Sequence, residues 1–144
     1  MTDRSATEDG AAALREVERE WNAAARDWNP ARLAALYTQD AVFYGGRAGH
    51  SVGREQIRAY FDSYAGLFAS VRLALVEQEL RPLGSGSLLA QGYAEFSFDF
   101  AAGGASTARL RSTLALIRQE EGWRILQHHF SATPDAPPIA MPER

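Results

Sequence analysis

The sequence predicts a single α+β domain in which N-terminal helices pack against one face of a curved antiparallel sheet. Up to Tyr64, apolar residues recur at spacings of three and four, which is the period of an amphipathic helix. From Ser70 onward they alternate with polar residues, which is the period of a strand. Glycine and proline divide this second part into segments of strand length. Helices followed by consecutive strands are typical of α+β domains.

The N-terminal part is expected to hold the helices. The first carries an apolar stripe made of Leu14, Val17, Trp21, Ala24 and Trp28, and we interpret Trp28 as a core residue. Asn29 suits a helix N-cap and Pro30 the first helical position, which predicts a short helix over 31–37. A strand is expected over 41–44. The next helix, starting near Ser51 or Gly53, presents Ile57, Tyr60, Phe61 and Tyr64 on one side.

Two long strands are expected in the middle of the sheet. In the strand over 88–100, alternation places Leu88, Ala90, Gly92, Ala94, Phe96, Phe98 and Phe100 on the inner face. In the strand over 107–119, Leu110, Ser112, Leu114 and Leu116 share one face. Acidic Glu95 and Asp99 can then lie opposite basic Arg109 and Arg111 on the outer face, which favours a cross-strand charge ladder there.

The last strand, over 122–134, holds two of the three histidines of the chain. Strict alternation places Trp123, Ile125, Gln127, His129 and Ser131 on one face, and Arg124, Leu126, His128 and Phe130 on the other. Adjacent histidines on one strand point to opposite faces and cannot chelate one ion together, so no metal site is expected.

Composition excludes several classes of function. A formal net charge of -3 over 144 residues is too small to indicate a nucleic acid or an anionic membrane as partner. The chain has no cysteine, which excludes disulfides and thiolate chemistry. No apolar run is long enough to span a bilayer, and a cytoplasmic location is expected. We expect one domain over 1–144, with a core over 8–134 and a proline-rich tail over 135–144.

The runs from Trp21 to Phe43 and from Ser51 to Phe61 resemble the opening of the nuclear-transport-factor-2-like superfamily. The closing segments at 122–125 and 129–134 are similar to the end of the calcium/calmodulin-dependent kinase II association domain and its bacterial, SnoaL-like relatives. The resemblance implies a cone-shaped, cystatin-like barrel with a pocket between sheet and helices, and a homodimer through the outer sheet face. It also implies that Gln127, His129 and Ser131 look into the cavity.

Ketosteroid isomerase is the best-understood enzyme on this scaffold, and it needs a tyrosine, a carboxylate base and a protonated acid. The resemblance carries these three positions onto Trp21, Gly45 and Leu114, so that chemistry is not expected. In the predicted cavity His129 is then either a structural or ligand-orienting histidine or the acid/base residue, with Gln127, Ser112 and Tyr60 or Tyr64 as further polar groups.

These observations predict a pocket for a small apolar or aromatic molecule, without a cofactor. The expected ligand-binding residues are Trp21, Phe43, Tyr60, Phe61, Phe96, Ser112, Leu114, Ile125 and Gln127. Three hypotheses stay open: a binding protein, a cofactor-free lyase, isomerase, dehydratase or polyketide cyclase that uses His129, and a homo-oligomerisation module.

Overall fold

The computed structural model describes residues 2–140 and 142, with side chains from residue 8 onward. The described part contains the helices α1 (Thr2–Ala25), α2 (Pro30–Ala34) and α3 (Arg54–Asp62). Its strands are β1 (Tyr37–Tyr44), β2 (Ser51–Val52), β3 (Phe68–Gly84), β4 (Ser87–Phe100), β5 (Ala105–Gln119) and β6 (Gly122–Ala132). They form one six-stranded sheet in the order β2-β1-β6-β5-β4-β3.

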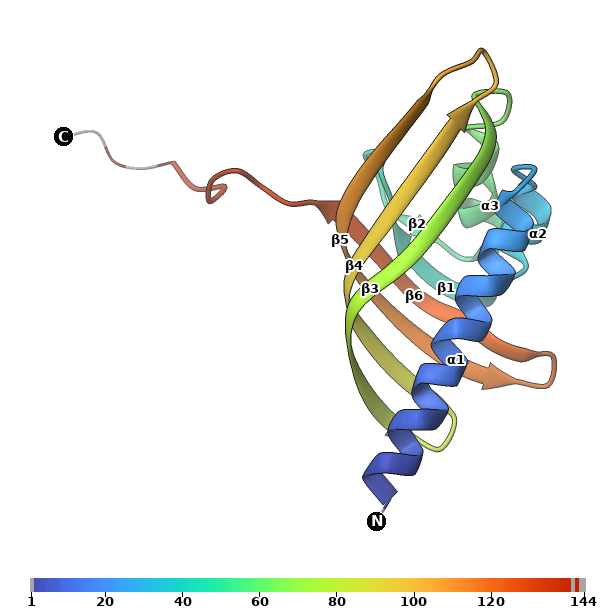
Figure 1. The fold of residues 1–144 in the computed structure, drawn as a ribbon, viewed down its shortest axis with the longest axis vertical. Coiled ribbons are helices and arrows are strands. Elements are labelled where there is room, and N and C mark those ends of the chain that lie inside the picture. Colours follow the sequence, from blue (N-terminus) through green and yellow to red (C-terminus); the bar gives the residue numbers. More distant parts are fainter. Residues whose placement is uncertain (1, 141, 143–144) are drawn as a thin grey trace.

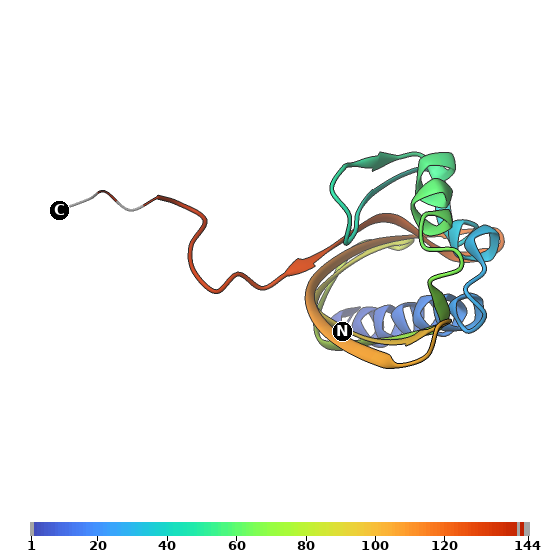
Figure 2. The ribbon, with the colours of Figure 1, turned by 90° about the horizontal axis from the view of Figure 1, so that it is seen from above.

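The sheet curves around α1, and α2 and α3 lie at one end of the concave side (Figures 1 and 2). The predicted α+β class, with helices packed on a curved sheet, is therefore confirmed. In detail the sheet is open and mixed: β1 runs parallel to β6, while every other pair in the order is antiparallel. The run of four consecutive antiparallel strands from β3 to β6 is as expected.

Helix α1 covers the concave side with the predicted stripe, in which Leu14, Val17, Trp21 and Ala24 are all buried. Burying one large apolar side chain stabilises a fold by about 1.5–3 kcal/mol. A polar side chain of the same helix also forms hydrogen bonds with the backbone of strand β3. The amide of Asn22 donates to the Leu73 carbonyl at 2.9 Å and accepts from its N–H at 2.7 Å. Helix α1 therefore also protects β3, which lies at the edge of the sheet.

A bulge bends strand β3 where it crosses β4. Val76 pairs with Tyr93 and Glu79 with Gln91, so β3 has one residue more than β4 in this interval. Glu77 takes a positive φ of 51° there. A Cβ on the facing Gly92 would stand 2.4 Å from the Glu77 carbonyl oxygen, so the two backbones can approach only because residue 92 is glycine.

The helix predicted over 31–37 ends earlier than expected. Helix α2 ends at Ala34, and Tyr37 already begins β1. The reason is tertiary: the N–H of Ile125 on β6 donates to the Leu36 carbonyl at 2.8 Å, which draws this segment into the sheet. The predicted N-cap is present, because Asn29 accepts a hydrogen bond from the N–H of Arg32.

A second bulge lies in β6 and changes the assignment of its faces. Leu116 pairs with Ile125 and the next residue of β5, Ala115, pairs with Gln127. Leu126 is therefore left without a partner on β5, and every later side chain of β6 points to the face opposite to the one predicted by alternation.

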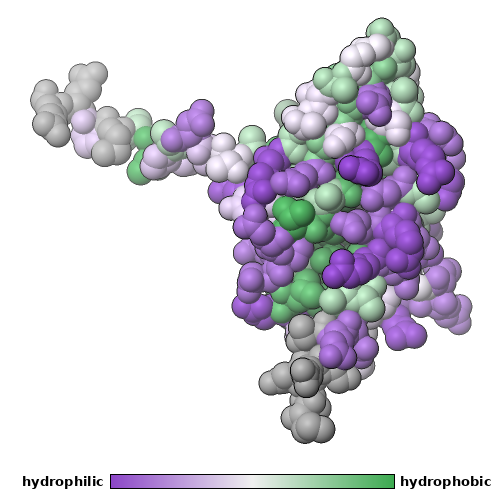
Figure 3. Space-filling view, in the orientation of Figure 1, coloured by the Kyte–Doolittle hydropathy of each residue, from purple (hydrophilic) through white to green (hydrophobic). Residues whose placement is uncertain are grey.

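Past β6, residues 133–140 are exposed and lead away from the body of the molecule (Figure 1). In the space-filling view, hydrophilic residues cover most of the visible face, while pale and hydrophobic ones gather at the end formed by the β4–β5 turn (Figure 3). No helix among the described residues is long and apolar enough to cross a membrane.

Candidate functional site

A cavity of about 310 Å³ opens at the end of the sheet where α3 faces the β4–β5 turn. Its floor consists of Trp21, Phe61, Phe96 and Phe130, which come from α1, α3, β4 and β6. Leu67, Phe100, Ser106 and Leu110 lie at its outer part, and Leu67 is 46% exposed. The cavity is therefore open to solvent at one end.

Aromatic rings fix the shape of this cavity. The ring of Trp21 meets those of Phe96 and Phe61 edge to face, with centroids 6.0 and 6.5 Å apart. Trp28 packs in the same way on Phe68, at 5.0 Å, and its indole N–H donates to the Phe61 carbonyl at 3.0 Å. Such pairs contribute about 0.5–1.5 kcal/mol each beyond the area that they bury. The cavity walls are thus held in place without a ligand.

Two phenol groups of α3 and its C-terminal turn supply the polar side of the cavity. The Tyr60 hydroxyl accepts a hydrogen bond from the N–H of Gly46 at 2.8 Å. The hydroxyls of Tyr60 and Tyr64 both lie within 4 Å of the point that a Cβ on Gly46 would occupy. Burial raises the pKa of Tyr60 above its ordinary value, the Gly46 N–H opposes this, and the neighbouring Tyr64 adds to it. Tyr60 therefore stays a protonated donor at neutral pH.

The loop over 45–50 closes this side of the cavity. Arg47 donates to the Ser63 hydroxyl at 2.7 Å and to the Ser63 carbonyl at 3.1 Å. Its guanidinium lies 4.1 Å from the centroid of the Tyr64 ring, a distance typical of a cation–π contact. Through these contacts one exposed side chain ties the loop to the end of α3.

The model of the SnoaL-like domain family matches residues 14–135, a range that includes every residue lining the cavity. This chain belongs to the SnoaL-like domain family. Among curated proteins, none matches it.

Solved structures place the domain in the nuclear-transport-factor-2-like fold. A structure from Xanthomonas campestris, named for the calcium/calmodulin dependent protein kinase II association domain, has 28% identity and a TM-score of 0.75 over 88% of this chain and 87% of its own. One from Novosphingobium aromaticivorans, named for scytalone dehydratase, has 11% identity and a TM-score of 0.79 over 93% and 89%. A nuclear-transport-factor-2-like superfamily protein from Salmonella enterica has 17% identity and a TM-score of 0.71 over 98% and 100%.

The predicted ligand-binding residues divide into two groups in this SnoaL-like domain. Those that line the cavity are Trp21, Tyr60, Phe61 and Phe96. Those that are buried but do not line it are Phe43, Leu114, Ile125 and Ser112. The rings of Phe61 and Phe130 pack on Phe43. Ser112, Leu114 and Ile125 are themselves buried side chains of strands β5 and β6.

The expectation that His129 and Gln127 face the cavity is wrong. His129 is exposed on the outer face, opposite Thr113, and Gln127 pairs with outward-facing Ala115. The physical reason is the bulge at Leu126, which reverses the parity of the strand after Ile125. The inward histidine is His128, which is only 1% exposed.

His128 lies behind the cavity floor rather than in it. Its Nδ1 is hydrogen-bonded to the Tyr37 hydroxyl at 2.9 Å, and the rings of Phe43 and Phe130 pack against it edge to face. Burial, and to a smaller extent the charge of His129, lowers the pKa of His128 to about 3. Burial likewise raises the pKa of Tyr37. Both groups are therefore neutral at physiological pH.

Several cavity residues escaped prediction from the sequence: Trp28, Phe68, Phe98 and Phe130. For Phe98 the signal was present, since alternation had placed it on the inner face with Phe96. For Phe130 strict alternation gave the wrong face, because the unpredicted bulge places that ring on the inner face. Tyr64 was predicted as an alternative to Tyr60, and the position of Gly46 shows that its hydroxyl belongs to the site.

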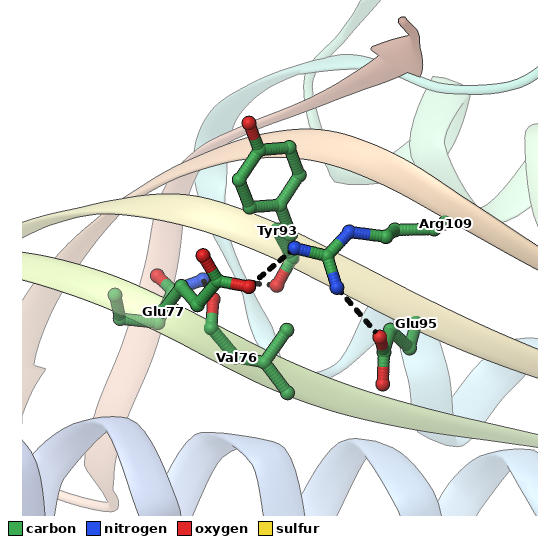
Figure 4. A network of polar contacts seen from close by, with 6 residues as sticks. Val76, Glu77, Tyr93, Glu95 and Arg109 are labelled. Carbon is green, nitrogen blue, oxygen red and sulfur yellow. Dashed lines mark hydrogen bonds and ion pairs between the residues drawn. The ribbon is translucent and has the colours of Figure 1, made fainter.

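The outer face of the sheet carries part of the predicted charge ladder. Glu95 lies opposite Arg109, while Asp99 lies opposite Ala105 and Arg111 opposite Tyr93. Arg109 of β5 forms ion pairs with Glu95 of β4, at 2.8 Å, and with Glu77 at the β3 bulge, and it lies over the Tyr93 ring (Figure 4). Next to it a polar groove of about 560 Å³ extends toward Arg111 and His129. Among the described residues, no group of three or more His, Cys, Asp or Glu side chains is close enough to hold a metal ion.

Proposed function

We propose that this SnoaL-like domain binds a small, flat, largely apolar molecule in the cavity beneath α3. The observation that carries the proposal is the cavity itself, about 310 Å³ in volume, open at one end and walled by aromatic rings. Small-molecule sites in proteins normally combine such an apolar lining with a few placed polar groups. Here Trp21 and Phe96 would contact the apolar body of the ligand, and Tyr60 would contact a polar edge.

The three tryptophans of the chain allow a direct test by NMR. Trp21 and Trp28 line the cavity, while Trp123 at the start of β6 does not. Titration with ethylnaphthalene, a two-ring hydrocarbon, is expected to shift the indole N–H signals of the first two and to leave the third unchanged. Equal shifts of all three signals, or of none, would contradict binding in this cavity.

A variant that fills the cavity supplies the second test. Leu110→Trp places a large ring at the outer part of the cavity, and we expect it to weaken ethylnaphthalene binding at least about tenfold by steric exclusion. Leu80→Trp is the matched control, because Leu80 is also half-buried but lies in a separate groove beside α1. Calorimetry, with protein titrated into the sparingly soluble ligand, compares the two variants.

The hypothesis of a cofactor-free lyase or isomerase needs an acid/base group that reaches the ligand. His129 points away from the cavity and His128 lies behind Phe130, so neither histidine supports it. Binding is the function that the remaining groups support best.

We also propose that two copies associate through the outer sheet face. Support comes from its mixed surface, where acidic Glu77 and Glu79 lie in the same groove as basic Arg111. A twofold contact brings the same patch of both copies together, and a patch that carries both signs of charge can be complementary to itself. Arg111→Glu would oppose it by placing like charges together, and analytical ultracentrifugation is expected to show a shift from dimer to monomer. A monomeric wild-type protein would refute this part of the proposal. It would also contradict the hypothesis that the domain is a homo-oligomerisation module.

A further inference from the structure

The geometry points to Tyr60 and Tyr64 as a paired hydrogen-bond donor that selects ligands bearing an acceptor oxygen, such as a ketone or quinone, at the edge of a flat apolar skeleton. This inference rests on the proposed function, since it concerns the chemistry of a ligand in the same cavity. It adds the residues that determine specificity and the functional group that they recognise.

The first observation is that two hydroxyls converge on one point of the cavity wall. Tyr60 lies on α3 and Tyr64 in the turn that follows it, and their ring centroids are 5.4 Å apart. Both oxygens lie beside Gly46, a cavity-lining residue, at distances of 3.6 and 3.4 Å from the point that its Cβ would occupy. Any side chain at residue 46 would fill the space between the hydroxyls.

The second observation concerns which hydrogens remain available. The Tyr60 oxygen already accepts from the Gly46 N–H. Burial raises the pKa of Tyr60, and hydrogen bonding with the Tyr64 hydroxyl raises this pKa further, which places the Tyr60 proton between the two phenols. The proton that the pair offers to a ligand is therefore that of Tyr64, and a ligand acceptor is favoured over a ligand donor. The guanidinium of Arg47 lies over the Tyr64 ring and holds that ring beside Tyr60.

The third observation is the contrast with the rest of the cavity. Its floor, made of Trp21, Phe61, Phe96 and Phe130, offers ring faces and edges. A ligand oxygen placed there would lose its hydration without gaining a strong partner, which costs free energy. The ligand is thus oriented with its apolar body on the floor and its oxygen toward Gly46.

The experiment compares two probes that differ in one group. Acetonaphthone and ethylnaphthalene, substituted at the same ring position, have nearly the same shape, but only the first carries a carbonyl oxygen. We expect the wild-type protein to bind the ketone about tenfold more tightly, as one extra hydrogen bond allows. Tyr64→Phe should remove most of this preference while the affinity for the hydrocarbon stays unchanged, and the double variant with Tyr60→Phe should remove the rest.

The controls separate the possible outcomes. Tyr93→Phe removes a phenol hydroxyl from the outer face and should keep the full preference for the ketone. Thermal unfolding of each variant shows whether it is folded, and Tyr64→Phe keeps the ring on which Arg47 stacks. If both probes bind with equal affinity to the wild type, or if the double variant keeps the preference, this inference is overturned and the proposed function stands. If neither probe binds, the proposed function falls as well.

Discussion

The buried pair of Tyr37 and His128 makes the stability of this domain dependent on pH. An ordinary histidine has a pKa of 6.5, and burial lowers that of His128 to about 3 in the folded protein. Between these two values the unfolded chain binds a proton at this side chain, while the folded protein does not. The free energy of unfolding must therefore rise with pH across this window. The stabilisation that depends on neutral His128 is fully present above the upper limit of the window and is lost as the pH falls toward the lower limit.

The magnitude follows from the pKa difference. Each pH unit inside the window corresponds to ~1.4 kcal/mol. Acidification from about pH 6.5 to about pH 4.5 should therefore cost about 2 kcal/mol through His128 alone, because the histidine of the unfolded chain is already half protonated at the upper limit. A cost of this size is a large fraction of the about 5–15 kcal/mol by which domains of this size are usually stable.

A double variant isolates this contribution. Tyr37→Phe with His128→Phe removes the titrating group together with its hydrogen-bond partner, and both positions are already surrounded by aromatic rings. Urea unfolding of wild type and variant, followed by circular dichroism at several pH values, gives the difference between their free energies. Because the carboxylates contribute alike to both proteins, their effect cancels in this difference.

We expect the wild type to lose stability toward acid more steeply than the double variant, by ~1.4 kcal/mol per pH unit. The matched control is His129→Asn, which changes the exposed neighbour and should keep most of the wild-type slope. Equal slopes for wild type and double variant would refute the reasoning, because they would mean that the buried ring accepts a proton in the folded state.

Three further predictions concern accessibility, motion and backbone fit. In the folded Arg111→Glu variant, whose outer sheet face should stay uncovered, diethylpyrocarbonate should modify His129, and His128 only after unfolding, as peptide mass spectrometry can determine. Arg47→Ala should release the loop from α3 and increase the dissociation rate of a bound naphthalene probe about fivefold, the equivalent of roughly one hydrogen bond, in stopped-flow measurements. Gly92→Ala should lower the free energy of unfolding by about 2 kcal/mol or more, because its Cβ meets the Glu77 carbonyl, and chemical denaturation measures this loss.

The order of the elements and the faces of most strands were predictable from the sequence. The α1 stripe around Trp21, the Asn29 cap and the inward faces of β4 and β5 all follow from local periodicity, which tertiary packing here reinforces. The Glu95–Arg109 pair was predictable in the same way, because it depends only on the register of one hairpin.

The predictions that were wrong concern segments whose structure depends on pairing between residues far apart in the sequence. Tyr37 has a helical pattern before it, but parallel pairing with β6 makes it the start of a strand. His128 and His129 lie on the faces opposite to those predicted, because β6 has one residue more than β5 at the bulge. Alternation in the sequence does not show where such a residue lies. The convergence of Tyr60 and Tyr64 depends on a glycine 14 residues before the first of them, and neither the spacing nor the residue types indicate that proximity.

The unpaired Leu126 also has a consequence for how such domains diversify. Because the side chains that follow it change sides together, the polarity of the interior depends on how many residues β6 contains as well as on which ones. Loss of a single codon between Ile125 and His128 would remove the extra residue and leave both imidazoles on their present faces. Gain of a codon between Leu126 and His128, with the added residue paired to β5, would instead turn one imidazole out and the other in, with no substitution at either position. A single insertion can therefore alter the chemistry of this interior in one genetic step.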